Sequence, residues 1–297
     1  LIDGRVEISR LEGELTTLTN DLAAWAADVP AVHPVTGEPF NAQQLLDEHS
    51  IRDEFKARVE SCWRRQSNLA PLNPEPQARY ELDLPLIITG DLPTLRTDFS
   101  HVAQLYLQSD SGLSGVGRFL ERFPRLNGLT IRNYRLGNIP EATFRMGELT
   151  TLALSDCQLT LTPQAVLDLA QMTRLDYLDL SENPLGLTPD LSQMPLLKTL
   201  LLNETGITEL PPGLFQFTEM ETVDLRSNQI THIAADIMEM PRDVAEAINL
   251  RGNPLSEESI QRLIAYFQQT SIDFGVEAVI DQAELEVSSS GGSDVDE

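Results

Sequence analysis

The segment TRLDYLDLSENPLGL, residues 173–187, brings leucine back at intervals that fit neither a regular helix nor a regular strand. Leu175 and Leu178 are three positions apart, Leu180 follows after two, and Asn183 comes next. A helix would repeat apolar residues every three or four positions, and a strand would repeat them every second position. The spacing therefore indicates a short strand that is followed at once by a turn.

The pattern L-x-x-L-x-L-x-x-N-x-L recurs along most of the chain. Its sixth position falls at residues 107, 131, 154, 180, 202, 225 and 250. These positions lie 22 to 26 residues apart, which is a period typical of one class of repeat protein. The sequence therefore predicts an α/β leucine-rich-repeat solenoid with a curved parallel sheet and a helical or irregular convex side.

Each fixed position of the repeat has a physical role. The two leucines of L-x-L point inward from a short strand, and the residues beside them point outward. The residue at the ninth position can satisfy backbone groups that the following turn exposes. We expect this structural turn role for five residues: Cys157, Asn183, Thr205, Asn228 and Asn253.

The flanks predict caps, because the end repeats of a solenoid would otherwise expose their leucines. We expect an N-terminal helical cap at 1–80, in which Ser9 with Glu12, and Asn41 with Gln44, have capping-box spacing. About seven repeats follow at 81–255, and within them Thr162 as N-cap and Pro163 as first residue predict a short helix at 162–172. Ser256 begins a capping helix at 256–270. Residues 271–297 end in Ser, Gly and acidic residues, which predicts a linker toward a further domain.

Composition excludes several kinds of partner. The net charge is −25 over 297 residues, which argues against nucleic acid and anionic membranes. No apolar run is long enough to cross a membrane, so membrane insertion is not expected. The two cysteines, Cys62 and Cys157, have no CxxC spacing, and the four histidines are scattered. We expect no catalytic residue, no metal site and no cofactor in this chain.

The outward positions of the strands predict a concave surface that binds a protein. Exposed aromatic and arginine side chains are common anchors in protein interfaces. The candidate contact residues are Tyr106, Arg132, Tyr177, Asp179, Leu201, Asp224 and Arg226. Residues 151–297 carry 25 acidic and 6 basic residues, so the hypothesis is a partner with a basic surface. The alternative is that the acidity only keeps the protein in solution.

The segment NLRGNPLSEESIQRLIAYFQQ, residues 249–269, resembles the last repeat of bacterial effectors of the novel E3 ubiquitin ligase (NEL) family. The matching positions are Gly252, Asn253, Pro254, Leu255, Ser256, Ser259 and Ile260. The resemblance implies an effector secreted by a bacterium into the host cytoplasm. It also implies that the repeats select a host substrate or restrain a ligase domain that works with a ubiquitin-loaded E2.

The Cys-x-Asp motif of such a ligase domain is absent here, since Trp63-Arg64 follow Cys62 and Gln158-Leu159 follow Cys157. The family's compact members also have shorter repeats than this chain. The first hypothesis is therefore a recognition module of an effector whose catalytic cysteine lies outside this chain. The alternative is a free-standing binding or inhibitor protein without a ligase domain.

Overall fold

The computed structural model describes residues 2–70, 79–109 and 115–282. The chain divides into two compact units, Leu1–Leu159 and Thr160–Glu297, which we call the N-terminal unit and the C-terminal unit. Residues 110–114, in the first repeat, and 283–297, the greater part of the expected linker, lie outside the described residues.

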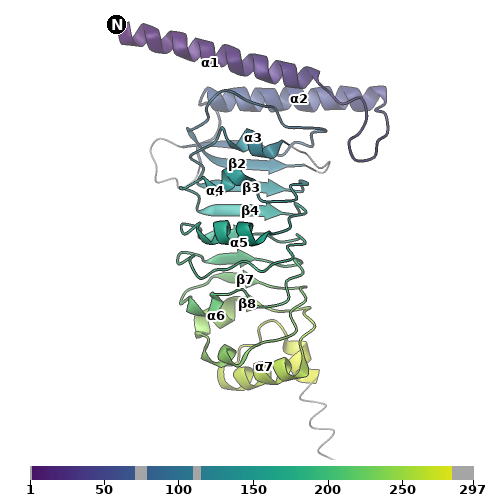
Figure 1. Ribbon diagram of the computed structural model, residues 1–297, viewed down its shortest axis with the longest axis vertical. Helices are drawn as coiled ribbons and strands as arrows, with labels where there is room; N and C mark the ends of the chain where they lie inside the picture. The colour runs from purple at the N-terminus through teal and green to yellow at the C-terminus, as the bar shows by residue number, and fades with distance from the viewer. Residues whose placement is uncertain (1, 71–78, 110–114, 283–297) are drawn as a thin grey trace, which may run out of the picture. The chain divides into compact units, whose positions relative to one another are not determined.

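The N-terminal unit consists of two helices, a parallel sheet and two short helices (Figure 1). Its elements are α1 (Ile2–Ala27), α2 (Ala42–Trp63), β1 (Tyr80–Leu84), β2 (Val102–Gln108), α3 (Val116–Leu120), β3 (Gly128–Arg132), α4 (Glu141–Phe144) and β4 (Thr151–Ser155). The strands pair in chain order, and Leu107, Ile131 and Leu154 lie in register and are fully buried. This stacking of inward leucines is the geometry that the repeat predicts.

The C-terminal unit continues the same scheme with shorter strands. Its elements are α5 (Pro163–Ala170), β5 (Tyr177–Asp179), β6 (Thr199–Leu201), the 3₁₀ turns η1 (Leu214–Gln216) and η2 (Ala235–Glu239), β7 (Thr222–Asp224), α6 (Arg242–Ala247), β8 (Ile248–Asn249) and α7 (Glu257–Thr270). Leu178 pairs in register with Leu200, and Leu200 with Val223, in parallel strands. Each of these three side chains is fully buried. The fold is that of a leucine-rich-repeat protein, as the sequence predicted.

The helix caps follow the sequence with one exception. Asn41 and Gln44 form the expected capping box at the start of α2. Thr162 caps α5, and Ser256 caps α7, by accepting a hydrogen bond from a backbone N–H three residues on. The expected box at Ser9 is wrong, because α1 already begins at Ile2 and Ser9 lies inside it.

Helix α2 covers the outer edge of the first strand. Arg58 Nη1 donates to the Asp83 carbonyl at 3.0 Å, and Cys62 Sγ lies 3.9 Å from the Glu81 carbonyl. The spacing matches, because residues four apart on a helix and two apart on a strand each share a side. The helix thereby satisfies edge groups of β1 that would otherwise be open to pairing with another chain.

Arg52 holds the helical cap and the first strand region together. Its side chain is 1% exposed and forms an ion pair with the buried Glu48 at 2.9 Å. It also donates to the carbonyls of Trp25, Asp28 and Thr89. Such a buried charge is tolerated because it is paired and each of its three nitrogens donates a hydrogen bond.

The expected linker is partly wrong, because residues 271–282 belong to the C-terminal unit. Ile272, Phe274, Val276 and Ile280 are buried, and the Leu250 N–H donates to the Phe274 carbonyl at 2.8 Å. The Phe274 ring also packs on Tyr266 of α7 with a centroid separation of 5.1 Å. This segment completes the capping of the last strand, because α7 alone does not satisfy the backbone of residue 250.

Candidate functional site

Successive side chains of a strand point to opposite faces of the sheet. In the C-terminal unit one face carries the buried leucines, and the other face is the outward one. Three columns of side chains project from that face. They are Tyr177, Thr199, Thr222 and Ala247; Asp179, Leu201, Asp224 and Asn249; and Ser181, Asn203, Arg226 and Arg251. Four residues that the sequence singled out, Tyr177, Leu201, Asp224 and Arg226, therefore lie on one face of this unit and retain exposed surface.

Asp179 is not available to a partner, so that part of the prediction is wrong. Its side chain is 3% exposed, and its carboxylate accepts hydrogen bonds from the Ser181 N–H at 2.9 Å and the Ser181 hydroxyl at 2.6 Å. Asp side chains commonly bond the backbone two residues on and so stabilise a local turn. The role of Asp179 is therefore to shape the end of its own strand.

The same local hydrogen bond recurs in the next polar positions of this column. Asp224 Oδ1 accepts from the Arg226 N–H at 3.1 Å, and Asn249 Oδ1 accepts from the Arg251 N–H at 3.0 Å. The recurring L-D-L-S, V-D-L-R and I-N-L-R stretches carry this signal in the sequence. One acceptor of each side chain is thus committed to the fold, which limits what it can offer to a partner.

Asp224 also fixes the Arg226 guanidinium. Arg226 Nε lies 2.8 Å from Asp224 Oδ1, and Arg226 Nη2 lies 2.6 Å from Asp224 Oδ2. This pairing raises the pKa of Arg226 above its ordinary value, so the guanidinium stays charged. Because Arg226 remains about half exposed, it presents a planar charged group in a fixed orientation.

Leu201 provides apolar surface in the same region. It pairs in register with Asp179 on one side and Asp224 on the other. Tyr177 and Thr199 form the adjacent pair, and all three of Tyr177, Thr199 and Leu201 are partly exposed. A partly exposed leucine beside an aromatic ring and a fixed ion pair is a composition common at protein interfaces.

A hollow of about 330 Å³ adjoins this face at the last strands. Its lining comes from β7, β8, residues 245–247 and the segment 272–275. Asp224 contributes from β7, Arg226 from the residues after it and Asn249 from β8, while Glu246 and Asp273 contribute from the segments beside these strands. Sequence reasoning missed Asp273 because it assigned that segment to a linker; the apolar spacing of Ile272, Phe274 and Val276 was the available signal.

The remaining sequence candidates, Tyr106 and Arg132, belong to the sheet of the N-terminal unit. The Tyr106 hydroxyl donates to Gln108 Oε1 at 2.6 Å, and Arg132 is exposed at the end of β3. The Gln104 side chain lies across Gly128 in the neighbouring strand, where an added Cβ would be 1.9 Å from Gln104 Oε1. Tyr106 and Arg132 therefore lie on the sheet of the N-terminal unit.

The turn residues work inside the fold. Asn228 Nδ2 donates to the carbonyls of Leu202 and Leu225, and its Oδ1 accepts from the N–H groups of Thr205 and Gly206. Asn253 Nδ2 donates likewise to the carbonyls of Leu225 and Leu250, and its Oδ1 accepts from the Ile230 N–H. Asn183 and Thr205 bond carbonyls of their own turns, and the buried Cys157 thiol lies 3.4 Å from the Ile131 carbonyl.

The chemistry of the described residues offers little for catalysis. Burial raises the pKa of the Cys62 thiol to about 11, which keeps it protonated and unreactive. Within residues 2–70, 79–109 and 115–282, no three His, Cys, Asp or Glu side chains are grouped so that they could bind a metal ion. No helix in that part of the chain is both long and apolar enough to span a bilayer.

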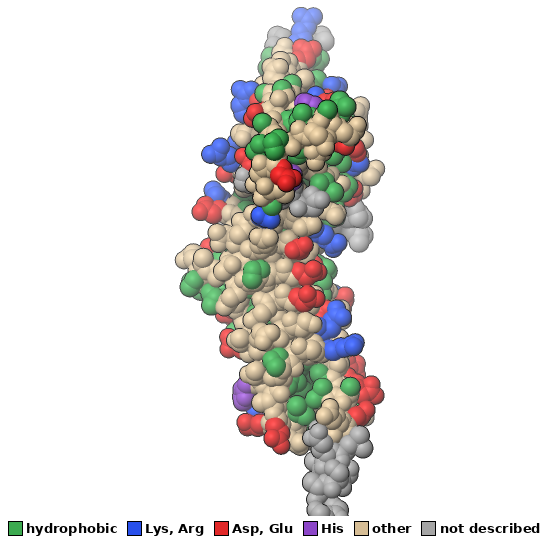
Figure 2. Space-filling model, turned by 90° about the vertical axis from the view of Figure 1, so that its right-hand side faces the viewer, with side chains coloured by type: hydrophobic (Ala, Val, Ile, Leu, Met, Phe, Trp, Pro, Cys, Tyr) green, Lys and Arg blue, Asp and Glu red, His purple; other side chains and the backbone are tan. Residues whose placement is uncertain are grey.

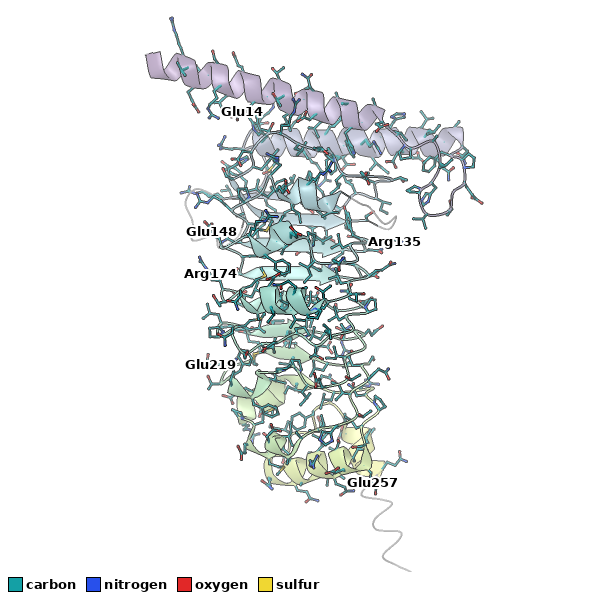
Figure 3. All side chains as sticks on the ribbon, viewed as in Figure 1. Glu14, Arg135, Glu148, Arg174, Glu219 and Glu257 are labelled. Carbon is teal, nitrogen blue, oxygen red and sulfur yellow. The ribbon has the colours of Figure 1, made fainter. Side chains whose placement is uncertain are left out.

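Acidic side chains outnumber basic ones in the C-terminal unit. Residues 160–282 contain 19 acidic and 6 basic residues. Figure 2 shows the side at which the strands end, where acidic groups predominate over the C-terminal part of the chain. Arg174 and Glu219 point outward on the side at which the chain enters the strands of this unit (Figure 3).

Comparison with known proteins gives limited similarity. No protein-family profile matches the chain. It is 29% identical over 174 residues to transforming growth factor beta activator LRRC33 of Danio rerio, a match that covers 57% of this chain and 24% of that protein. The chain therefore spans about a quarter of the length of this curated relative.

Among solved structures, it is similar to the Arabidopsis receptor kinase HAESA, solved with the peptide hormone IDA and the co-receptor SERK1. The TM-score is 0.44 at 18% identity, covering 72% of this chain and 43% of that one. It is also similar to an LRR protein of Leptospira interrogans, with a TM-score of 0.40 at 18% identity, covering 58% of each chain.

Proposed function

We propose that this chain is a protein-recognition module that binds its partner through the exposed sheet face of the C-terminal unit. The observation that carries the proposal is the grouping of Leu201, Tyr177 and the Asp224–Arg226 ion pair on one face of β5–β7. The inward face of the same strands is filled by leucines of the chain itself. The outward face is the one whose side chains remain accessible to a partner.

The partner is proposed to present a basic surface. The excess of acidic over basic residues in 160–282 creates a negative potential that attracts such a surface and repels acidic ones. Long-range attraction of this kind acts mainly on the association rate and is screened by salt. We expect the association rate to fall steeply between low and physiological ionic strength, whereas an unchanged rate would contradict a basic partner.

The wider context is proposed from the NEL resemblance of residues 249–269. In this proposal the parent protein is a bacterial effector that enters the host cytoplasm and acts as an E3 ubiquitin ligase. The chain described here would choose the host substrate or restrain the ligase. Cys62 and Cys157 are both buried, so this proposal assigns the catalytic cysteine to another part of the parent protein.

Partner recognition by this chain and ligase activity of the parent protein are tested by separate experiments. For recognition, a captured partner is purified and titrated against the chain and against Leu201→Ala, with Leu167→Ala on α5 as the matched control. We expect the affinity to fall at least ~10-fold for Leu201→Ala and to stay unchanged for Leu167→Ala, whose side chain is also exposed. Equal affinities would remove the sheet face as the binding surface.

For the parent activity, ubiquitin discharge from a loaded E2 is measured with the full-length parent protein. Discharge that depends on a cysteine outside residues 1–297 supports the ligase proposal. Absence of discharge, together with retained partner binding, would favour the free-standing binding or inhibitor protein.

A further inference from the structure

The hollow beside β7 and β8 is lined both by the sheet and by the segment 272–275 after α7. It measures about 330 Å³, which lies at the small end of the range for ligand pockets. The surface of its lining is mainly polar, because Val223, Ile248 and Phe274 are each at most 4% exposed; Thr222 and Ala247 are lining residues that retain exposed surface. The ionisable groups around it are Asp224, Glu246 and Asp273, with Arg226 as the one base among the lining residues.

The state of each charged group decides what the hollow can accept. Asp224 and Arg226 neutralise each other through three contacts of 2.6–3.1 Å, so neither offers a full net charge. Asp273 uses Oδ1 to accept the Gly275 N–H at 2.8 Å, and its side chain remains partly exposed. Glu246 shares its charge with Arg242, which stands outside the lining. The net charge of the four lining groups is negative.

The segment 272–275 forms the wall of the hollow that carries Asp273, and contacts within the chain fix this wall. The Leu250 N–H bonds to the Phe274 carbonyl at 2.8 Å, and the Phe274 ring packs on Tyr266. Gly275, at φ +73°, approaches Asn249 so closely that an added Cβ would lie 2.4 Å from Asn249 Oδ1. A wall fixed in this way loses little conformational freedom on binding.

We propose that this hollow receives one lysine or arginine side chain of the partner, with its aliphatic stem against Thr222 and Ala247 and its charge beside Asp273. Lysine and arginine combine these two properties, because their methylene stems bury while their charged ends reach polar groups. The negative field of residues 160–282 favours a cation at the same place. The inference rests on the proposed recognition function and names the residue type that anchors the partner.

An acidic side chain bound by Arg226 is the competing occupant. The Asp224 carboxylate already engages Arg226 Nε and Nη2, and an incoming anion would be repelled by Glu246 and Asp273, which also line the hollow. Charge complementarity therefore favours the cation. The two occupants make opposite predictions in a peptide selection.

The test uses random twelve-residue peptides displayed on phage and selected against the whole chain. We expect the selected peptides to share one Lys or Arg position, and replacement of that Lys by norleucine to weaken binding at least ~10-fold. Asp273→Asn should weaken binding of the same peptides to a similar degree, while leaving the affinity of the norleucine peptide unchanged. Asn keeps the Oδ1 acceptor for the Gly275 N–H, so this variant retains the wall.

Matched variants separate this inference from the proposed function. Asp236→Asn, on η2, removes an exposed acid outside the hollow and should leave binding unchanged. Peptides that lose affinity on Leu201→Ala but show no basic preference, or an acidic one, would overturn the lysine or arginine anchor and leave sheet-face recognition intact. Peptides that respond to neither Leu201→Ala nor Asp273→Asn, or a selection that yields no binder, would overturn both.

Discussion

Asp179 and Leu201 occupy paired positions in neighbouring strands, yet only Leu201 retains surface for a partner. The difference comes from the residue two positions on. Ser181 gives Asp179 both a backbone N–H and a hydroxyl, so the carboxylate turns back on its own chain. The leucine side chain has no hydrogen-bond acceptor, so Leu201 cannot bond the residue two positions on, Asn203, in the way that Asp179 bonds Ser181.

The turn asparagines are where single residues matter most for stability. Asn228→Ala should lower the free energy of unfolding by about 2–4 kcal/mol, because it leaves buried backbone groups of residues 202, 205, 206 and 225 without partners. Urea unfolding followed by circular dichroism measures this change. Asn203→Ala, on the sheet face, is the matched control and should have little effect.

His101 gives a pH dependence whose sign follows from its surroundings. Burial lowers the pKa of His101 below its ordinary value of 6.5, its backbone contact with Cys62 opposes this, and Arg65 and Asp98 act in opposite directions. Its Nε2 lies 2.9 Å from the Cys62 carbonyl. Between the lowered folded pKa and 6.5 the unfolded chain binds more protons, so the free energy of unfolding falls as the pH is lowered through that window.

The measurement is urea unfolding of the chain and of His101→Gln from pH 7.5 to pH 5. The stability lost by the parent chain should be partly abolished in His101→Gln. His49→Gln, which removes an exposed histidine, should keep the full pH dependence. Identical profiles for the parent chain and His101→Gln would contradict this role.

Among the helices and strands, the sequence predicted best those helix starts at which a capping residue directly precedes the helix. The capping box at Asn41, the Thr162–Pro163 start of α5 and the Ser256 start of α7 all appear as expected, because their side chains satisfy N–H groups within a few residues. Ser9 with Glu12 has the same spacing but sits inside α1. There the helix continues through both residues, so no free N–H groups need a cap.

The segment after α7 shows why an element boundary could not be found from composition. Residues 283–297 are rich in Ser, Gly and acidic residues. Because of this composition, the linker predicted from the sequence also included residues 271–282. Phe274 reaches the Leu250 backbone through a contact between residues far apart in the sequence. No local pattern encodes a contact of this kind.

This segment yields a stability prediction. Phe274→Ala should cost about 3–5 kcal/mol, because the ring is 1% exposed and packs on Tyr266. Val279→Ala, whose side chain is 40% exposed, is the control and should cost much less. Thermal unfolding compares the two, and equal melting temperatures would mean that residues 271–282 do not cap the repeats.

The contact of Arg52 on α2 with the segment after β1 yields a second stability prediction of this kind. Arg52→Met should lower the free energy of unfolding by about 3–5 kcal/mol, since it leaves the Glu48 charge buried without its partner. The double variant Arg52→Met with Glu48→Met should cost less than the sum of the single changes. Arg10→Met, which breaks an exposed ion pair on α1, should change little.

At the scale of the whole molecule, periodicity alone predicted the parallel strands and the inward leucines, because each repeat must bury what it cannot bury by itself. It also identified the face on which Tyr177, Leu201, Asp224 and Arg226 lie. It could not identify the hollow, since Asp273 joins Asp224 there only through the folding of the segment after α7. The charge of the sequence gives the direction of attraction but not the place of contact.

Site-specific photocrosslinking measures whether the sheet face of the C-terminal unit is the surface that binds a protein. A benzophenone amino acid is placed at Leu201 on β6 or at Leu167 on α5, and each chain is irradiated with its purified partner. We predict a crosslinked complex for position 201 and none for position 167. Crosslinking at 167 with none at 201 would contradict the account.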